Sequence, residues 1–219
     1  MSKTYKTVAG YGEDEFIVSK SRFIGYVNRA ETEEEALEFI QKIKEMHKTA
    51  THNVYAYIIG EAGILQRFSD DGEPSGTAGI PALEVLKKED LKNVVVVVTR
   101  YFGGVKLGGG GLVRAYSKSA KIAVDSGIIV DMTPFERIRV EISYTAYGKL
   151  ENYLRDKGIS PEETSFGDDV SLEVYIDSED LDLFQSELND MTSGTVKLTF
   201  LGESMLPVRD GERLQNVGI

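Results

Sequence analysis

The sequence predicts an α+β protein of two domains, the second with a ferredoxin-like order of elements. Three observations carry this prediction. First, 219 residues with 41% hydrophobic content suit one large domain or two small ones with packed cores. Second, residues 135–205 show the order β-α-β-β-α-β in about 70 residues, which is the ferredoxin-like arrangement. Third, the charge changes at the same place, because residues 1–134 carry a net charge of -1 and residues 135–219 a net charge of -10.

Two short β-type runs, Phe16–Val18 and Phe23–Val27, open the first domain. A helix is expected next, because Thr32 and Glu35 have the spacing of a capping box. One helical stripe of apolar residues follows, made of Ala36, Phe39, Ile40 and Ile43.

Two strands, Val54–Ile59 and Ile64–Phe68, are joined by a connection of hairpin length. A helix is expected over Thr77–Lys88. The run Val94–Val98 shows no alternation, which indicates a central strand buried on both faces. The last helix of the first domain is expected over Gly111–Asp125, closed by a Ser-Gly pair.

Pro134 marks the expected domain boundary, and the periodicity becomes clearer after it. We expect a first domain at residues 1–134, a ferredoxin-like domain at residues 135–205 and an irregular tail at residues 206–219. The elements expected in the second domain are strands near 138–144, 160–166, 170–176 and 196–200, and helices near 147–154 and 181–191.

Composition excludes several classes of protein. The chain has no cysteine, so disulfides, thiolate metal sites and thiol nucleophiles are excluded together. The longest apolar run, Val94–Val98, is far shorter than the roughly 20 residues of a transmembrane helix. The segment Met1–Lys6 has no apolar core and is not a signal peptide. We expect a cytoplasmic protein without a membrane partner.

The most unusual stretch runs from Leu91 to Val124, where six basic side chains occur and no acidic one does. A valine run leads into a loop made largely of glycine, and a helical pattern leads out. Glycine lets the backbone approach a ligand closely, and the N-terminus of a helix adds partial positive charge. We interpret this stretch as a surface for polyanions, RNA in particular. The expected phosphate-binding residues are Arg100, Lys106, Gly108, Gly109, Gly110, Gly111, Arg114, Lys118 and Lys121.

Helical spacing places Arg114, Lys118 and Lys121 on one face of the last helix. We expect these cations to lack an acidic partner on that helix. A solvated amphipathic face would show the same spacing, but the neighbouring Arg100 and Lys106 favour an anion-binding surface. Tyr101 and Phe102 either stack on bases beside these charges or pack against the glycine loop.

The overall net charge of -11 is unfavourable for a nucleic-acid partner, because like charges repel phosphate. Screening limits the reach of exposed charges to about 8 Å at physiological salt. A basic face is therefore compatible with a protein whose second half is acidic.

A second candidate site combines His52 with the carboxylates of Asp70, Asp71 and Glu73. Three carboxylates within four residues suit an oxygen-ligated Mg²⁺, which supports an alternative function as a metal-assisted hydrolase. The competing interpretation is a turn in which the aspartates bond to local backbone and cap the next helix. We favour the turn, and therefore a binding protein over an enzyme.

The glycine loop does not fit the known nucleotide fingerprints. Gly109 stands where a P-loop needs lysine. The dinucleotide pattern, started at Gly108 or Gly109, ends on Val113 or Arg114 instead of glycine. Two histidines without cysteines make a zinc site unfavourable. The sequence therefore predicts no cofactor, no metal site and no catalytic residue.

Three blocks of sequence resemble the IMPACT family. They are His52–Tyr57, Asp70–Gly79, and Arg100–Gly108 continued by Gly110–Tyr116. The resemblance covers roughly residues 15–130, and the two-domain length resembles the bacterial branch of the family, the YigZ/YvyE-type proteins.

This resemblance implies a first domain of the ribosomal protein S5 second-domain type, with two layers and the helices on one face of the sheet. It also implies a ferredoxin-like second domain, a pairing similar to adjacent domains of elongation factor G. Eukaryotic members restrain a translation-stress kinase by competing for its ribosome-associated activator. We therefore expect a link to translation, with RNA or the ribosome as partner and basic ribosomal proteins as partners for the acidic second half.

Overall fold

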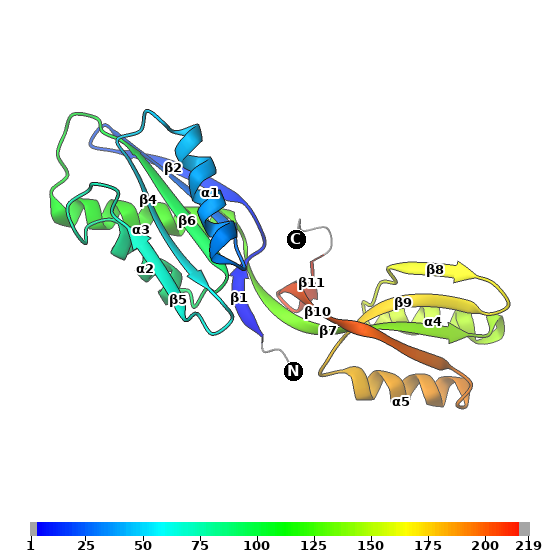
Figure 1. Cartoon of the computed structure of the whole chain (residues 1–219). Coiled ribbons are helices and arrows are strands. Elements are labelled where there is room, and N and C mark those ends of the chain that lie inside the picture. The colour runs from blue at the N-terminus through cyan, green and yellow to red at the C-terminus, as the bar shows by residue number, and fades with distance from the viewer. Residues whose placement is uncertain (1–3, 215–219) are drawn as a thin grey trace. The chain divides into compact units, whose positions relative to one another are not determined.

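The computed structural model describes residues 4–214 and has the predicted α+β class (Figure 1). It divides into two compact units. Among the described residues, the first unit comprises Tyr5–Met132 together with residues 207–214, and the second unit comprises Thr133–Leu206 together with Thr4.

The first unit contains a five-stranded antiparallel sheet. Its central strand holds the valine run, and all five valines are fully buried, as the lack of alternation predicted. In spatial order the strands are β2 (Gly12–Val18), β3 (Ser21–Arg29), β6 (Val94–Tyr101), β4 (His52–Ile59) and β5 (Leu65–Ser69). A further strand that the sequence did not predict, β1 (Tyr5–Val8), pairs with the start of β7 (Ile129–Ile142).

Helices cover both faces of this sheet, so the expectation of two layers with the helices on one face is wrong. Helix α1 (Glu33–Met46) packs on one face, and α2 (Gly79–Lys88) and α3 (Gly109–Ser126) pack on the other (Figure 1). The central strand explains the difference. Val95 and Val97 join the core beneath α1, while the alternate valines of β6 join the core beneath α2 and α3.

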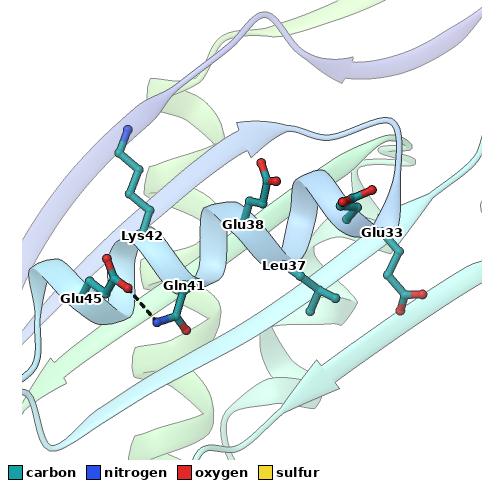
Figure 2. A pocket seen from close by; sticks show the side chains of 7 residues that line it. Glu33, Leu37, Glu38, Gln41, Lys42 and Glu45 are labelled. Atoms are coloured by element: carbon teal, nitrogen blue, oxygen red, sulfur yellow. Dashed lines mark hydrogen bonds between the residues drawn. The ribbon is translucent and has the colours of Figure 1, made fainter.

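Helix α1 begins with the predicted capping box. The Glu35 N–H donates to Thr32 Oγ1 at 3.2 Å, and the Glu35 carboxylate accepts from the Thr32 N–H at 3.4 Å. The apolar stripe faces the sheet, and the opposite side of the helix is acidic (Figure 2). That outer side is an open surface lined by this helix alone, with residues Glu33, Glu34, Leu37, Glu38, Gln41, Lys42 and Glu45.

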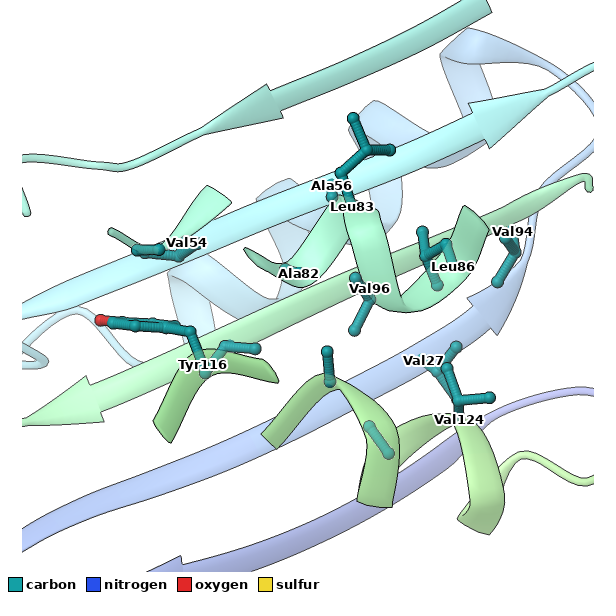
Figure 3. Close-up of a cluster of buried hydrophobic side chains, with 14 of the residues drawn as sticks. Val27, Val54, Ala56, Ala82, Leu83, Leu86, Val94, Val96, Tyr116 and Val124 are labelled. Carbon is teal, nitrogen blue, oxygen red and sulfur yellow. The ribbon is translucent and has the colours of Figure 1, made fainter. Parts of the chain in front are cut away.

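The core on the other face joins α2, α3 and the sheet (Figure 3). Leu83 of α2 lies by Ala56 of β4, and Leu86 lies near Val94 and Val96 of β6 (Figure 3). Val124 of α3 lies near Val27 of β3. Close approach of α3 requires Gly25 in β3, where a Cβ would stand 2.3 Å from the carbonyl oxygen of Ser119.

The second unit has the predicted ferredoxin-like order β-α-β-β-α-β, and its strands lie in the order β10-β7-β9-β8. One apolar core joins its helices to the sheet, with Leu150, Leu172 and Leu188 among its most buried members. The elements after β7 are α4 (Tyr144–Asp156), β8 (Glu163–Phe166), β9 (Val170–Asp177), α5 (Leu181–Thr192) and β10 (Lys197–Arg209).

The expectation of an irregular tail from residue 206 is wrong for the part of the tail that the structure describes. Strand β10 continues to Arg209 and pairs through a tight turn with β11 (Glu212–Arg213). Asp210 and Gly211 both have positive φ, 53° and 82°, as a type I′ hairpin turn requires. The rest of the expected tail, residues 215–219, lies outside the described residues.

Across residues 4–214, none of the helices is long and apolar enough to cross a membrane.

Candidate functional site

The candidate site surrounds the end of the central strand β6. The strand ends at Tyr101, and the segment Phe102–Gly108, called the glycine loop here, leads to the first residue of α3 at Gly109. The β2–β3 hairpin and the turn after β5 flank this loop, so three parts of the sequence that lie far apart along the chain meet there.

The register of the paired strands determines which side chains lie at the base of the site. Phe23 of β3, Arg100 of β6 and His52 of β4 are direct cross-strand neighbours. All three therefore lie in one row on the face of the sheet that α2 and α3 cover.

Arg100 is buried at the centre of this row and is only 5% exposed. Its Nη1 donates to Glu73 Oε1 at 2.5 Å, and that same oxygen accepts from the Tyr116 hydroxyl at 2.8 Å. His52 Nε2 lies 3.7 Å from it. We call Arg100, Glu73, Tyr116 and His52 the buried cluster. The expectation that Arg100 belongs to an exposed phosphate-binding surface is wrong, because its charge is buried and paired with Glu73.

The Glu73 carboxylate is the common neighbour of the other three members of the buried cluster. Burial, and then the Glu73 carboxylate, raise the pKa of the Tyr116 phenol well above its usual range, so the hydroxyl stays a donor. His52 Nδ1 lies 2.8 Å from the carbonyl oxygen of Asp71. A carbonyl only accepts, so this contact assigns the proton to Nδ1 and turns Nε2 toward Glu73.

The acidic turn does not form a metal site. Asp70 accepts from the N–H groups of Gly76, Ala78 and Gly79 and so caps α2, as the competing interpretation proposed. Asp71 Oδ2 accepts from the Asn53 N–H at 2.6 Å, while Glu73 is committed to Arg100.

The three carboxylates therefore serve three different partners. Among the described residues no group of three His, Asp or Glu side chains is placed to hold a metal. The alternative of a metal-assisted hydrolase loses the ligand set on which it depended.

Three cations of the basic stretch are exposed, namely Lys106, Arg114 and Lys118. Within residues 4–214 no ion pair involves any of them. The Arg114 guanidinium lies beside the first turn of α3, since its Nη1 is 3.9 Å from where a Cβ on Gly110 would stand. Lys118 Nζ lies 4.4 Å from the centre of the Phe16 ring of β2.

Lys121 differs from these three. Its Nζ pairs with Asp125 at 2.6 Å and with Glu89 of α2 at 3.2 Å. The hydrogen bond to Asp125 is the main cause of its raised pKa. The expectation that Lys121 lacks an acidic partner on its helix is wrong, because Asp125 lies one turn further along α3.

The N-terminus of α3 is open. Gly108 has φ of 70°, no side chain caps the helix, and its first turn contains no acidic residue. By contrast, α1 has three glutamates in its first turn, and Asp70 caps α2. Gly108, Gly109 and Gly110 are exposed, whereas Gly111 is half-buried, with space for a Cβ limited by Leu107 at 3.0 Å.

We call Lys106, Arg114, Lys118 and the exposed first turn Gly108–Gly110 the basic face. Unneutralised partial charge at a helix N-terminus and three unpaired cations attract the same kind of ligand, an anion. A groove of about 390 Å³ between α2 and α3 is lined by Lys118 of the basic face, but also by Lys88, Lys121, Glu84 and Glu89, so its charge is mixed.

Lys20 is a neighbour of the glycine loop that the sequence did not indicate. It occupies the two-residue β2–β3 turn with Ser19, and both have positive φ. A Cβ on Gly103 would stand 1.9 Å from the Lys20 carbonyl oxygen, so the hairpin tip packs directly on the loop. The side chain of Lys20 is exposed, which adds a fourth cation beside the basic face.

The two aromatic candidates have different surroundings. Tyr101 points to the α1 side of the sheet, where its hydroxyl lies 2.9 Å from His47 Nδ1. Phe102 remains on the glycine loop and is 46% exposed. Only Phe102 is therefore placed beside the basic face.

The fold and site define a class of α+β protein in which a buried central strand leads through a glycine loop into an uncapped helix. A family model described as the Impact N-terminal domain matches residues 19–124, and a second, described as a domain of unknown function, matches residues 140–195. The chain belongs to the IMPACT family, as the three sequence blocks indicated.

Relatives in bacteria match nearly the whole chain. The IMPACT family member YvyE of Bacillus subtilis is 43% identical over 217 residues, which cover 97% of this chain and 100% of that protein. YigZ of Escherichia coli is 31% identical over 191 residues, covering 85% and 92%. Protein IMPACT-B of Xenopus tropicalis is 37% identical over 94 residues, which cover 41% of this chain and 29% of that protein.

One solved structure, described only as that of a hypothetical protein, superposes with a TM-score of 0.57 at 26% identity. The match covers 92% of this chain and 99% of the other.

Replacing Glu73 with glutamine should destabilise the protein by about 3–5 kcal/mol, because it leaves the buried Arg100 without a counter-charge. Urea unfolding followed by circular dichroism measures the change. Glu84→Gln is the matched control, since Glu84 forms an exposed pair with Lys87 and should cost less than about 1 kcal/mol. Equal effects of the two substitutions would contradict a structural role for the Arg100–Glu73 pair.

His47 should make the free energy of unfolding decrease as the pH is lowered. Burial, and then the nearby Arg22, lower its pKa below the ordinary value of about 6.5, and its ring lies between the Tyr26 and Tyr101 hydroxyls. Below that ordinary value the unfolded chain takes up the proton first, so the free energy of unfolding decreases as pH falls toward the folded-state pKa. Unfolding between pH 7 and 5.5 should show a shallower decrease for His47→Gln than for the unsubstituted protein. Identical slopes would refute the lowered pKa.

Proposed function

We propose that the protein binds RNA, free or within the ribosome, through the basic face, and modulates translation by doing so. The observation that carries this proposal is an uncapped helix N-terminus on a loop and helix that also carry three exposed cations, none of which is in an ion pair among residues 4–214. Phosphate satisfies both features, because it is an anion and accepts hydrogen bonds from backbone N–H groups.

The distribution of charge supports binding despite the acidic average. Of the six cations in the basic stretch, Lys92, Arg100 and Lys121 are neutralised by ion pairs, whereas Lys106, Arg114 and Lys118 are in none among the described residues. The acidic side of α1 lies on the other face of the sheet from α3. Screening over about 8 Å separates the two charged surfaces at physiological salt.

The link to translation rests on the family. The Impact N-terminal domain model matches residues 19–124, which include the glycine loop, and the family resemblance implies a regulator that works at the ribosome. Basic ribosomal proteins suit the acidic second half, whose net charge is -10 over residues 135–219. Cytoplasmic localisation is part of the same proposal.

Charge reversal on α3 should weaken RNA binding. The double substitution Arg114→Glu/Lys118→Glu removes two cations of the basic face and should lower affinity at least about tenfold at low salt. With Lys20 included, about four phosphates are in reach, so log affinity of the unsubstituted protein should fall with log salt at a slope near -2.8 to -3.6. Fluorescence anisotropy with labelled RNA and co-sedimentation with ribosomes measure both quantities.

The matched control reverses two exposed lysines near α1, Lys42→Glu/Lys48→Glu. It changes the net charge by the same amount on the opposite side of the sheet. If the two double variants weaken binding equally, the basic face is not the binding surface, and only the net charge of the protein matters.

A further inference from the structure

We infer that the RNA at the basic face is single-stranded, and that Phe102 stacks on one of its bases. This inference rests on the proposed function and adds the class of RNA that the site accepts. It is carried by the surroundings of Phe102 and does not depend on the cations alone.

The backbone around Phe102 is held from both sides. The Phe102 N–H donates to Thr51 Oγ1 at 3.0 Å, and the next N–H, of Gly103, donates to Ser21 Oγ at 3.2 Å. Gly103 also packs against the carbonyl oxygen of Lys20. The ring is therefore presented by an anchored segment, although it lies on a loop.

One side of the Phe102 ring is covered by a cation. The Arg100 guanidinium carbon lies 5.4 Å from the centre of the Phe102 ring and 5.4 Å from that of Phe23. Glu73 fixes this guanidinium, which therefore lies within cation–π distance of both rings. The Phe102 side chain is still 46% exposed, so part of its surface is open to solvent.

The surroundings leave room for a planar ligand and supply its phosphate partners. A Cβ on Gly104 would meet no atom within 4 Å outside its chain neighbours, so the loop is open at Gly104, two residues after Phe102. Lys106 follows on the same loop, and Lys20 packs against Gly103 from the hairpin. A base on the ring and phosphates on these lysines together match the pattern of single-strand binding sites.

Stacking distinguishes single strands from duplexes. In a duplex the faces of the bases are covered by their neighbours, so the protein meets phosphates, 2′-hydroxyls and base edges but no base face. An unpaired base can place its face on Phe102, so a single strand gains a contact that a duplex lacks.

The test compares a labelled 12-nucleotide single-stranded RNA with the same strand annealed to its complement, by fluorescence anisotropy on the full chain at one salt concentration. The single strand should bind more tightly by about fivefold or more. Phe102→Leu keeps apolar cover over Arg100 but removes the ring, and should weaken single-strand binding by about 5- to 100-fold while leaving duplex binding unchanged. Phe102→Tyr keeps the ring and should bind as the unsubstituted protein does.

Duplex binding as tight as single-strand binding, or full single-strand affinity in a folded Phe102→Leu variant, would overturn this inference and leave the proposed function standing. Absence of binding to either RNA at low salt would overturn the proposed function and this inference with it. Thermal unfolding of each variant establishes that it is folded.

Discussion

The ion pair between Arg100 and Glu73 is the interaction on which the rest of the site depends. It ties the end of the central strand to the turn that precedes α2, and through the Tyr116 hydroxyl to α3. A buried charge pair of this kind is weak support for stability as such, but removal of one partner is costly. Its consequence here is positional, because the glycine loop and the start of α3 are anchored to a fixed point of the core.

This arrangement separates the cations of the site into an inner layer, which is buried and paired, and an outer layer, which is exposed. In the inner layer Arg100 is buried, compensated and unavailable to a ligand. In the outer layer Lys106 and Arg114 are exposed near a helix end that no side chain caps, and the exposed Lys118 follows one turn after Arg114. The inner layer positions Phe102 and the loop, while the outer layer supplies the attraction for phosphate. A net charge of -11 hides both layers, because electrostatic binding depends on the local surface.

Local patterns in the sequence were sufficient for most of the elements, although not for β1 or β11, and for the order of elements in the second unit. The capping box of α1, the buried valine strand and the ferredoxin-like order depend on neighbours along the chain, and all three are confirmed. The burial and ion pairing of Arg100 could not be predicted in this way. Its neighbours lie on β3, β4 and the turn before α2, and strand register brings them together. Lys20 was missed for the same reason. The Asp210-Gly211 turn, in contrast, carried a hairpin signal that was overlooked.

The central claim is that RNA meets this protein at the glycine loop and the first turn of α3. The most direct test is an amide NMR titration of the full chain with a short single-stranded RNA. The account predicts the largest shifts at Phe102 and Gly108–Gly110, with smaller ones at Lys20 and Arg114 and almost none along the outer side of α1. Saturable shifts confined to α1 or to residues 133–206, with the glycine loop unchanged, would contradict it.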